Sequence, residues 1–256
     1  MIFAHWMISS NAGDNIGPWL VEQLAGEFPI WTDDREVSKV LLCGSILNHA
    51  KANTRVWGAG LASMKDSVLQ DGLTICAVRG PLTRAIVLAH DVRCPEVYGD
   101  PALLTSRLVP RPVKPPGLVA VIPHYVDGPR CAWWLSGRTD VVVVNPLWPV
   151  ERYVASVSSA RAVVSSSLHG IILADAFGLP RCWASFSDSV GGDGTKFRDH
   201  DLAMGLPASV ALDRRGGLEA IDFGTLPYVT VSPSHVRAVQ DGLLRCCPFP
   251  IRGDLL

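Results

Sequence analysis

Short apolar runs alternate with amphipathic segments along most of this chain, and this alternation restricts the possible folds more than any other feature. In the first half, the runs expected to form strands are residues 39–43, 54–57, 73–78 and 96–98. In the second half, they are residues 118–122, 140–144, 162–165 and 181–184. Strands that alternate with helices are joined by crossovers, so neighbouring strands run parallel. The sequence therefore predicts an α/β protein with mostly parallel sheets.

A proline-rich segment divides this alternation into two similar parts. Residues 110–117 hold four prolines in eight positions, which is incompatible with a helix or a central strand and favours a stiff extended linker. Because the βα pattern occurs on both sides, we expect two Rossmann-like lobes, residues 1–109 and residues 118–230. The remaining segment, residues 231–256, is expected to hold one helix that begins after Ser232 as its N-cap and packs back across the lobes.

Composition excludes several classes of function. The formal net charge is −1, so no global field recruits nucleic acid or an anionic membrane. Seven cysteines without a C-x-x-C pair predict reduced thiols in a cytosolic protein, with neither a disulfide framework nor a zinc site. The N-terminus lacks the pattern of a signal peptide, and the apolar runs are far shorter than the roughly 20 residues of a membrane-spanning helix. We expect a cytoplasmic protein that is at most peripheral to the inner membrane.

The turn between a strand at residues 162–165 and a helix at residues 168–177 is the strongest candidate site. Ligands of parallel sheets bind at such turns, where helix N-termini present free N–H groups to anions. Ser165, Ser166 and Ser167 add three hydroxyls, followed by Leu168 and His169 in the first helical turn. Histidine is suited to acid/base chemistry at neutral pH. An equally supported alternative is a serine N-cap beside a packed histidine.

A second strand-to-helix turn contains Arg79. Its guanidinium stands at the end of a strand, where it could hold a carboxylate or phosphate with two hydrogen bonds. A salt bridge that closes the turn is the commoner role for such an arginine. Pro81 at the first helical position, with Leu82 and Ile86 on one apolar face, predicts the helix that follows.

Two weaker candidates lie near other strand ends. Gly13, Asp14 and Asn15 form a loop that runs into a helix and could bring its backbone close to a ligand. His124 follows the strand at residues 118–122 and adds an imidazole to the polar groups expected at this edge. A plain turn with a helix cap, and a histidine packed in the core, are the simpler interpretations.

A glycine-rich loop near residue 193 leads into a helix with Lys196 and Arg198 close to its start. Cations are unfavourable at a helix N-terminus, so this placement favours an anion bound there. Asp100, in a Gly-Asp-Pro turn, is expected to be a structural cap.

Taken in order, these motifs resemble the polysaccharide pyruvyl transferase family. The matching segments are residues 13–15, 44–45, 58–60, 78–81, 99–104, 165–170 and 196–199. The resemblance implies a two-lobed arrangement similar to GT-B glycosyltransferases, with phosphoenolpyruvate bound between the lobes. It implies transfer of the enolpyruvyl group to a sugar of a glycan as a ketal, without a metal or redox cofactor. Whether that glycan is lipid-linked, and in what oligomeric state the protein acts, the sequence leaves open.

The resemblance also assigns roles to residues. It implies that His169 is the general acid/base, that Arg79 and Lys196 bind the anion, and that the three serines donate hydrogen bonds to it. Many family members carry arginine where this chain has Ser167. Its loss would weaken anion binding unless Arg198, Arg79 or Lys196 supplies the charge, which leaves a changed donor or a weaker activity as alternatives.

Two other functions fit the same pattern. A GT-B-like glycosyltransferase would use the lobes and helix N-termini to bind a nucleotide sugar. A non-catalytic sugar- or anion-binding protein would retain the fold and lose the chemistry, as the missing arginine would allow.

Overall fold

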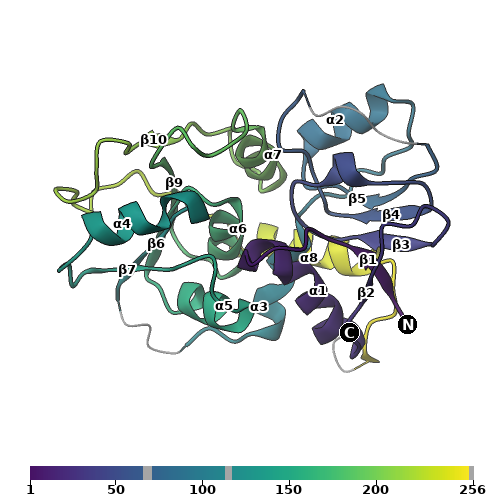
Figure 1. The fold of residues 1–256 in the computed structure, drawn as a ribbon, viewed down its shortest axis with the longest axis horizontal. Helices are drawn as coiled ribbons and strands as arrows, with labels where there is room; N and C mark the ends of the chain where they lie inside the picture. The colour runs from purple at the N-terminus through teal and green to yellow at the C-terminus, as the bar shows by residue number, and fades with distance from the viewer. Residues whose placement is uncertain (66–70, 113–116, 254–256) are drawn as a thin grey trace.

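Two five-stranded parallel sheets, one in each half of the chain, form the framework of the protein (Figure 1). The computed structural model describes residues 1–65, 71–112 and 117–253. The first sheet contains β1 (Phe3–His5), β2 (Ile30–Trp31), β3 (Lys39–Leu41), β4 (Thr54–Trp57) and β5 (Thr74–Ala77). The second contains β6 (Val119–Ile122), β7 (Val141–Val143), β8 (Ala162–Ser165), β9 (Arg181–Ser185) and β10 (Leu212–Asp213). The prediction of an α/β protein with mostly parallel sheets is confirmed.

The two sheets share one strand order. The first runs β2-β1-β3-β4-β5, and the second, read from its opposite edge, runs β7-β6-β8-β9-β10. In each sheet the chain therefore starts near the middle, fills one edge and then reverses direction. Ligands of such sheets bind where the order reverses, beyond the carboxyl ends of the strands. This places candidate sites beyond β1 and β3 in the first half and beyond β6 and β8 in the second.

Helices connect the strands and cover the sheets. The α-helices are α1 (Ala12–Ala25), α2 (Pro81–Ala89), α3 (Thr105–Leu108), α4 (Gly128–Trp134), α5 (Val150–Ser158), α6 (Leu168–Ala176), α7 (Thr195–Ala203) and α8 (Pro233–Arg245). Short 3₁₀ helices are η1 (Leu47–His49), η2 (Pro101–Leu104) and η3 (Tyr125–Asp127). None of the described helices is long and apolar enough to cross a bilayer. All seven cysteines are free thiols.

The halves pack against each other through helices. α1 lies against α5, α2 against α7, and the fully buried α6 against η2. The last helix, α8, contacts both halves, because Trp57 Nε1 donates to the Leu243 carbonyl and His235 Nε2 lies 3.0 Å from the Ala203 carbonyl. This agrees with the expectation that the final helix packs across the lobes.

Several local predictions need correction. The segment Gly13–Asn15 is no loop: Asn11 caps α1 by accepting the Gly13 N–H, so these residues form the first helical turn. Residues 96–98 form no strand beyond one bridge between Val78 and Tyr98.

Two further details differ near helix starts. On α2, Thr83 and Val87 are buried in place of the predicted apolar face. Ser232 precedes α8 as expected, but its hydroxyl pairs with Ser234 and caps no backbone N–H. Residues 113–116 of the predicted linker lie outside the described residues.

Candidate functional site

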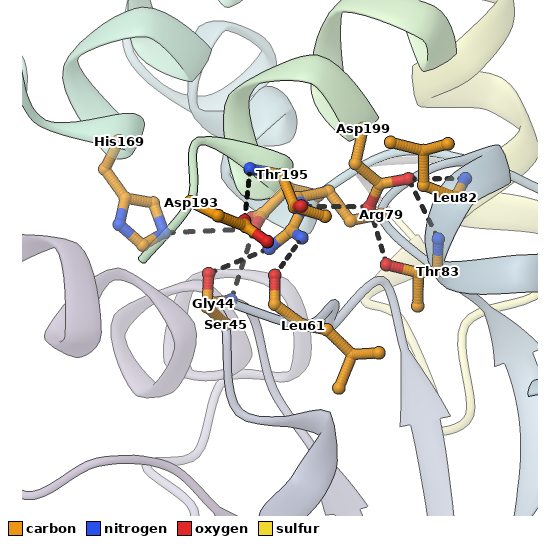
Figure 2. A network of polar contacts seen from close by, with 11 residues as sticks. Gly44, Ser45, Leu61, Arg79, Leu82, Thr83, His169, Asp193, Thr195 and Asp199 are labelled. Atoms are coloured by element: carbon orange, nitrogen blue, oxygen red, sulfur yellow. Dashed lines mark hydrogen bonds and ion pairs between the residues drawn. The ribbon is translucent and has the colours of Figure 1, made fainter. Parts of the chain in front are cut away.

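The serine turn and His169 lie where β8 ends and α6 begins. Figure 2 shows the His169 side chain beside the polar contacts that join the two halves. The His169 side chain is nearly buried, with 7% of the residue exposed. Its Nε2 atom lies 3.8 Å from Asp100 Oδ2 and has no hydrogen-bond partner among the described residues. A buried imidazole nitrogen without a partner is unusual, because buried polar atoms are nearly always hydrogen-bonded.

Asp100 reaches this histidine from the first half of the molecule. Its Oδ1 accepts the Ala102 N–H at 2.9 Å and thereby caps η2, as predicted, while Oδ2 accepts the Gly44 N–H at 3.2 Å. The thiol of Cys43 is buried beside it, and the potential ligand atoms of Cys43, Asp100 and His169 all lie within 4.8 Å of one another. Burial raises the pKa of the Cys43 thiol well above its usual value, and the charge of Asp100 raises it further.

The three serines have different surroundings. The Ser165 hydroxyl lies 2.8 Å from the carbonyl oxygens of Ile122 and Ser167 and accepts the Ser167 N–H, so it closes the turn. The Ser166 hydroxyl accepts the His124 N–H at 2.8 Å, which leaves its own proton for a ligand. Ser167 occupies the N-cap position of α6 but makes no side-chain cap. Leu168 begins that helix and is buried in the core.

A cavity of about 120 Å³ adjoins the turn, between β9 and the glycine-rich loop. Its lining includes Ser166, Ser185, Ser187 and Lys196. Lys196 makes no hydrogen bond or ion pair with any described residue, and its ammonium lies 5.5 Å from the Phe197 ring centre. Burial lowers its pKa and the nearby Arg79 charge lowers it further, while Asp14 opposes the shift. Lys196 therefore lines the cavity as a cation that forms no ion pair with a carboxylate of the described residues, although the Asp14 charge acts on it from farther away.

His124 lies near this lysine. Its Nδ1 is buried and has no hydrogen-bond partner in the described part of the chain, and its ring lies 4.4 Å from that of Tyr125. Burial lowers the pKa of His124, and so does the Lys196 charge. At neutral pH this favours the neutral imidazole, which can donate or accept one hydrogen bond.

The predicted anion ligand Arg79 is engaged elsewhere in this conformation (Figure 2). The side chain is completely buried, and its nitrogens donate to Asp199 Oδ2, to Ser45 Oγ and to the Leu61 carbonyl. Asp199 also accepts the backbone N–H groups of Leu82 and Thr83 at the start of α2. The structure thus places Arg79 in the salt bridge that was the commoner alternative, and each of its three guanidinium nitrogens already donates a hydrogen bond.

Arg198 and the α1 residues serve the neighbouring loops. Arg198 Nη2 donates to the Asp193 carbonyl at 2.8 Å and so closes the glycine-rich loop. Asp14 accepts the Ser9 hydroxyl, and Asn15 Nδ2 donates to the Ser9 carbonyl. All three residues thus hold neighbouring loops, and the Asp14 charge also acts on Lys196 and His124.

Gly13 contacts the catalytic candidate itself. A Cβ atom built on Gly13 would lie 2.3 Å from His169 Nδ1, far inside contact distance. The first turn of α1 can therefore approach the imidazole this closely only because residue 13 has no side chain.

A larger cavity, of about 550 Å³, lies at the other end of α6 beside Phe177 and the start of α8. Its Arg107 side chain already binds Gln240, and Arg111 Nη2 binds the Ala160 carbonyl. None of the predicted site residues lines it, so we place the candidate site at the serine turn and not in the larger cavity.

Two contacts between the halves were not predicted from the sequence. Asp100 contacts His169 in addition to its expected capping role, and Asp199, in the segment 196–199, pairs with Arg79. The only sequence signal for these aspartates is their place in short motifs, the Gly-Asp-Pro turn for Asp100 and the segment 196–199 for Asp199. Such motifs do not indicate which residue of the other half each aspartate contacts.

Comparison with known proteins gives three findings. A family model described as "Polysaccharide pyruvyl transferase" matches residues 25–185, which includes the motifs from residue 44 to residue 170 and excludes residues 13–15 and 196–199. The uncharacterized protein L143 of Acanthamoeba polyphaga mimivirus is 26% identical over 258 aligned positions, covering 95% of this chain and 90% of that protein. The succinoglycan biosynthesis protein ExoV of Rhizobium meliloti (strain 1021) is 27% identical over 208 positions, covering 77% of this chain and 62% of ExoV. No solved structure matches the chain significantly.

Proposed function

This chain belongs to the polysaccharide pyruvyl transferase family, as its ordered motifs predicted, and from that premise we propose that it transfers the enolpyruvyl group of phosphoenolpyruvate to a sugar as a pyruvate ketal. Family membership and the similarity to ExoV support a role in pyruvyl transfer during polysaccharide biosynthesis. The donor, the ketal product and the residues that act on them are the parts we propose. We also propose a cytoplasmic site of action and a two-lobed arrangement similar to GT-B enzymes.

The observation that carries this proposal is the unpaired ammonium of Lys196. A half-buried cation without a counter-ion is costly, and a second cation nearby, Arg79, increases the cost. A bound anion relieves both effects. The adjoining cavity of about 120 Å³ also offers the hydroxyl proton of Ser166, so it suits a small ligand that bears oxygen anions. Phosphoenolpyruvate carries a phosphate and a carboxylate on a three-carbon unit.

In this scheme Lys196 supplies the charge that the family's usual arginine would supply at position 167. Arg79 adds positive potential from its buried position without a direct contact. The hydroxyls of Ser166 and Ser167 and the N-terminal N–H groups of α6 donate hydrogen bonds to the ligand oxygens.

His169 is proposed to move the protons. The imidazolium gives a proton to the enol methylene, which becomes a methyl group and leaves an oxocarbenium-like centre at the neighbouring carbon. One sugar hydroxyl adds to that carbon and loses its proton to the imidazole. The carbon–oxygen bond to phosphate then breaks, and a second hydroxyl adds, its proton leaving with the phosphate. The products are the ketal and inorganic phosphate, with no electron donor or acceptor required.

Calorimetric titration with phosphoenolpyruvate tests this proposal. We expect the wild-type protein to bind it, and Lys196→Ala to bind about 10–150-fold more weakly, since a hydrogen bond to a charged group contributes about 1.5–3 kcal/mol. Lys196→Arg should retain most of the affinity. Lys51→Ala, which removes a surface lysine paired with Asp33, is the matched control and should bind like the wild type.

Inorganic phosphate and a nucleotide sugar serve as contrast ligands. Tight binding of the nucleotide sugar without binding of phosphoenolpyruvate would replace this proposal with a glycosyltransferase. Equal affinity of the wild type and Lys196→Ala for phosphoenolpyruvate would show that Lys196 does not bind this ligand.

A further inference from the structure

The two nitrogens of the His169 imidazole have different surroundings. Nε2 is buried, has no hydrogen-bond partner among the described residues and faces Asp100 Oδ2 at 3.8 Å. Nδ1 lies on the opposite side of the ring, against the first turn of α1, where Gly13 leaves it room. A neutral imidazole carries one proton. If a neighbouring acceptor binds the N–H of one nitrogen, the other nitrogen is the one that can exchange a proton with a ligand.

Asp100 is fixed for such a role. Its side chain is completely buried, and each carboxylate oxygen accepts one backbone N–H, from Ala102 and from Gly44. These two bonds set the plane of the carboxylate. A carboxylate oxygen has more than one lone pair, so Oδ2 can still accept a proton donor from the side of His169.

The distance of 3.8 Å is too long for a hydrogen bond, and a small approach would close it. Asp100 belongs to the first half of the molecule and His169 to the second, so the distance changes whenever the halves shift. Catalytic hydrogen bonds are often long in ligand-free structures and shorten when substrate binds.

We propose that Asp100 is a positioning residue for His169: it accepts the Nε2 proton, and so leaves Nδ1 as the nitrogen that exchanges a proton with the substrate. In the proposed reaction, the Nδ1 proton of the imidazolium is the one given to the enol methylene, and Nε2 keeps its proton throughout. This assignment rests on the proposed function for its chemistry. The arrangement of protons on His169 can be measured independently of it.

The neighbouring thiol of Cys43 offers a different use of the same atoms. A soft divalent cation could bind Cys43, Asp100 and His169 together, since their ligand atoms lie within 4.8 Å of one another. The thiol is protonated in the metal-free protein, because burial and the Asp100 charge raise its pKa. The hydrogen-bonded positions of Asp100 favour the positioning role, and the metal is an outcome that the experiment can detect.

Nitrogen-15 NMR of histidine-labelled protein tests the proposal, with the His169 signals identified by their loss in His169→Gln. In the wild type we expect the neutral imidazole to carry its proton on Nε2, and phosphoenolpyruvate to move that proton signal downfield as the bond to Asp100 shortens. In Asp100→Ala no side-chain acceptor remains to hold the Nε2 proton, so the preference for Nε2 should be lost and the Nδ1 tautomer should become populated. A wild-type His169 with its proton on Nδ1, or the same tautomer in both proteins, would overturn the assignment.

Asp199→Asn is the matched control, because it alters the other buried carboxylate between the halves without touching His169. It should lower stability and leave the His169 tautomer on Nε2. Addition of Co²⁺ separates the metal alternative: a thiolate-to-cobalt absorption band that Cys43→Ser abolishes would show a metal site and contradict the positioning role. If phosphoenolpyruvate fails to bind the wild type while the tautomer depends on Asp100, the proposed donor is wrong and the positioning contact stands.

Discussion

Each half of the molecule places one buried aspartate against the other half, and the two contacts differ in how many of their polar atoms are hydrogen-bonded. Asp199 from the second half meets Arg79 and the start of α2, while Asp100 from the first half meets His169 at the start of α6. Around Asp199, both carboxylate oxygens and all three guanidinium nitrogens have partners. At His169, Nε2 has none among the described residues.

From this difference we distinguish a contact that stabilises the fold from one that we propose takes part in the reaction. A buried ion pair with every hydrogen bond satisfied holds its geometry, and loss of one partner leaves an uncompensated charge. A buried nitrogen without a partner costs free energy in the resting protein, and such sites often coincide with functional residues. We therefore interpret the Arg79–Asp199 contact as structural, whereas the His169–Asp100 contact is the one that we propose acts in the reaction.

The largest expected effect is on turnover, and it comes from substitution of His169 in the His169–Asp100 contact. His169→Gln should lower phosphate release from phosphoenolpyruvate in the presence of the glycan acceptor by about 10²–10⁴-fold, the usual contribution of a general acid/base. Thermal unfolding should change little, since Nε2 makes no hydrogen bond that the substitution would break. Turnover within a few-fold of the wild type would exclude His169 from proton transfer.

The Arg79–Asp199 contact should instead control the free energy of unfolding. Asp199→Ala leaves the buried Arg79 charge and the N–H groups of Leu82 and Thr83 without partners, so the free energy of unfolding should fall by about 3–5 kcal/mol. Chemical denaturation measures this. Asp199→Asn keeps an acceptor for the two N–H groups and should cost less. A loss below about 1 kcal/mol would show that water or another group replaces the carboxylate.

A methyl group at the junction tests how closely α1 and His169 are packed. Gly13→Ala should lower the free energy of unfolding by about 1–3 kcal/mol, because its Cβ would lie 2.3 Å from His169 Nδ1. Turnover should fall as well, since the imidazole has to move. Gly128→Ala is the matched control: nothing lies within 4 Å of its Cβ position, and alanine there should be neutral or slightly stabilising. Equal effects of the two substitutions would contradict the close packing.

The smallest effect concerns pH. In the proposed site, phosphoenolpyruvate binds the ammonium form of Lys196, and burial lowers the pKa of this lysine below the ordinary value of 10.5. Affinity should therefore weaken as pH rises, beginning at a lower pH than for an exposed lysine. Calorimetry across neutral to alkaline pH measures this, and Lys196→Arg should remove the decline because guanidinium stays charged. The same decline in Lys196→Arg would assign it to another group.

Apolar patterning accounted for most of the fold. The strands at residues 54–57 and 162–165 have the predicted bounds, because each is a run of four residues bordered by turn signals. Strands β1, β2 and β10, of two or three residues, were missed; β3 and β7 have three residues each but lie within the longer predicted runs 39–43 and 140–144.

The site was predicted where local signals sufficed. The sequence marks the turns between apolar strands and the helices that follow them. This signal was enough to select the serine turn, His169 and Lys196 as candidates. The contacts between the halves could not, because Arg79 and Asp199 are 120 positions apart and only the packing of α2 against α7 brings them together. Whether an arginine binds a substrate or a distant aspartate depends on tertiary contacts that a local pattern does not contain.

The capping of α2 by Asp199 has a consequence for how the protein folds. The first half can form its sheet, but two N–H groups of α2 and the Arg79 charge acquire their partner only when α7 is in place. During synthesis the buried Arg79 charge can therefore be neutralised by Asp199 only after residue 199 has been made and α7 has packed against α2. The halves should then melt in one cooperative transition, and an isolated first half should be less stable than its share of the sheet contacts would indicate.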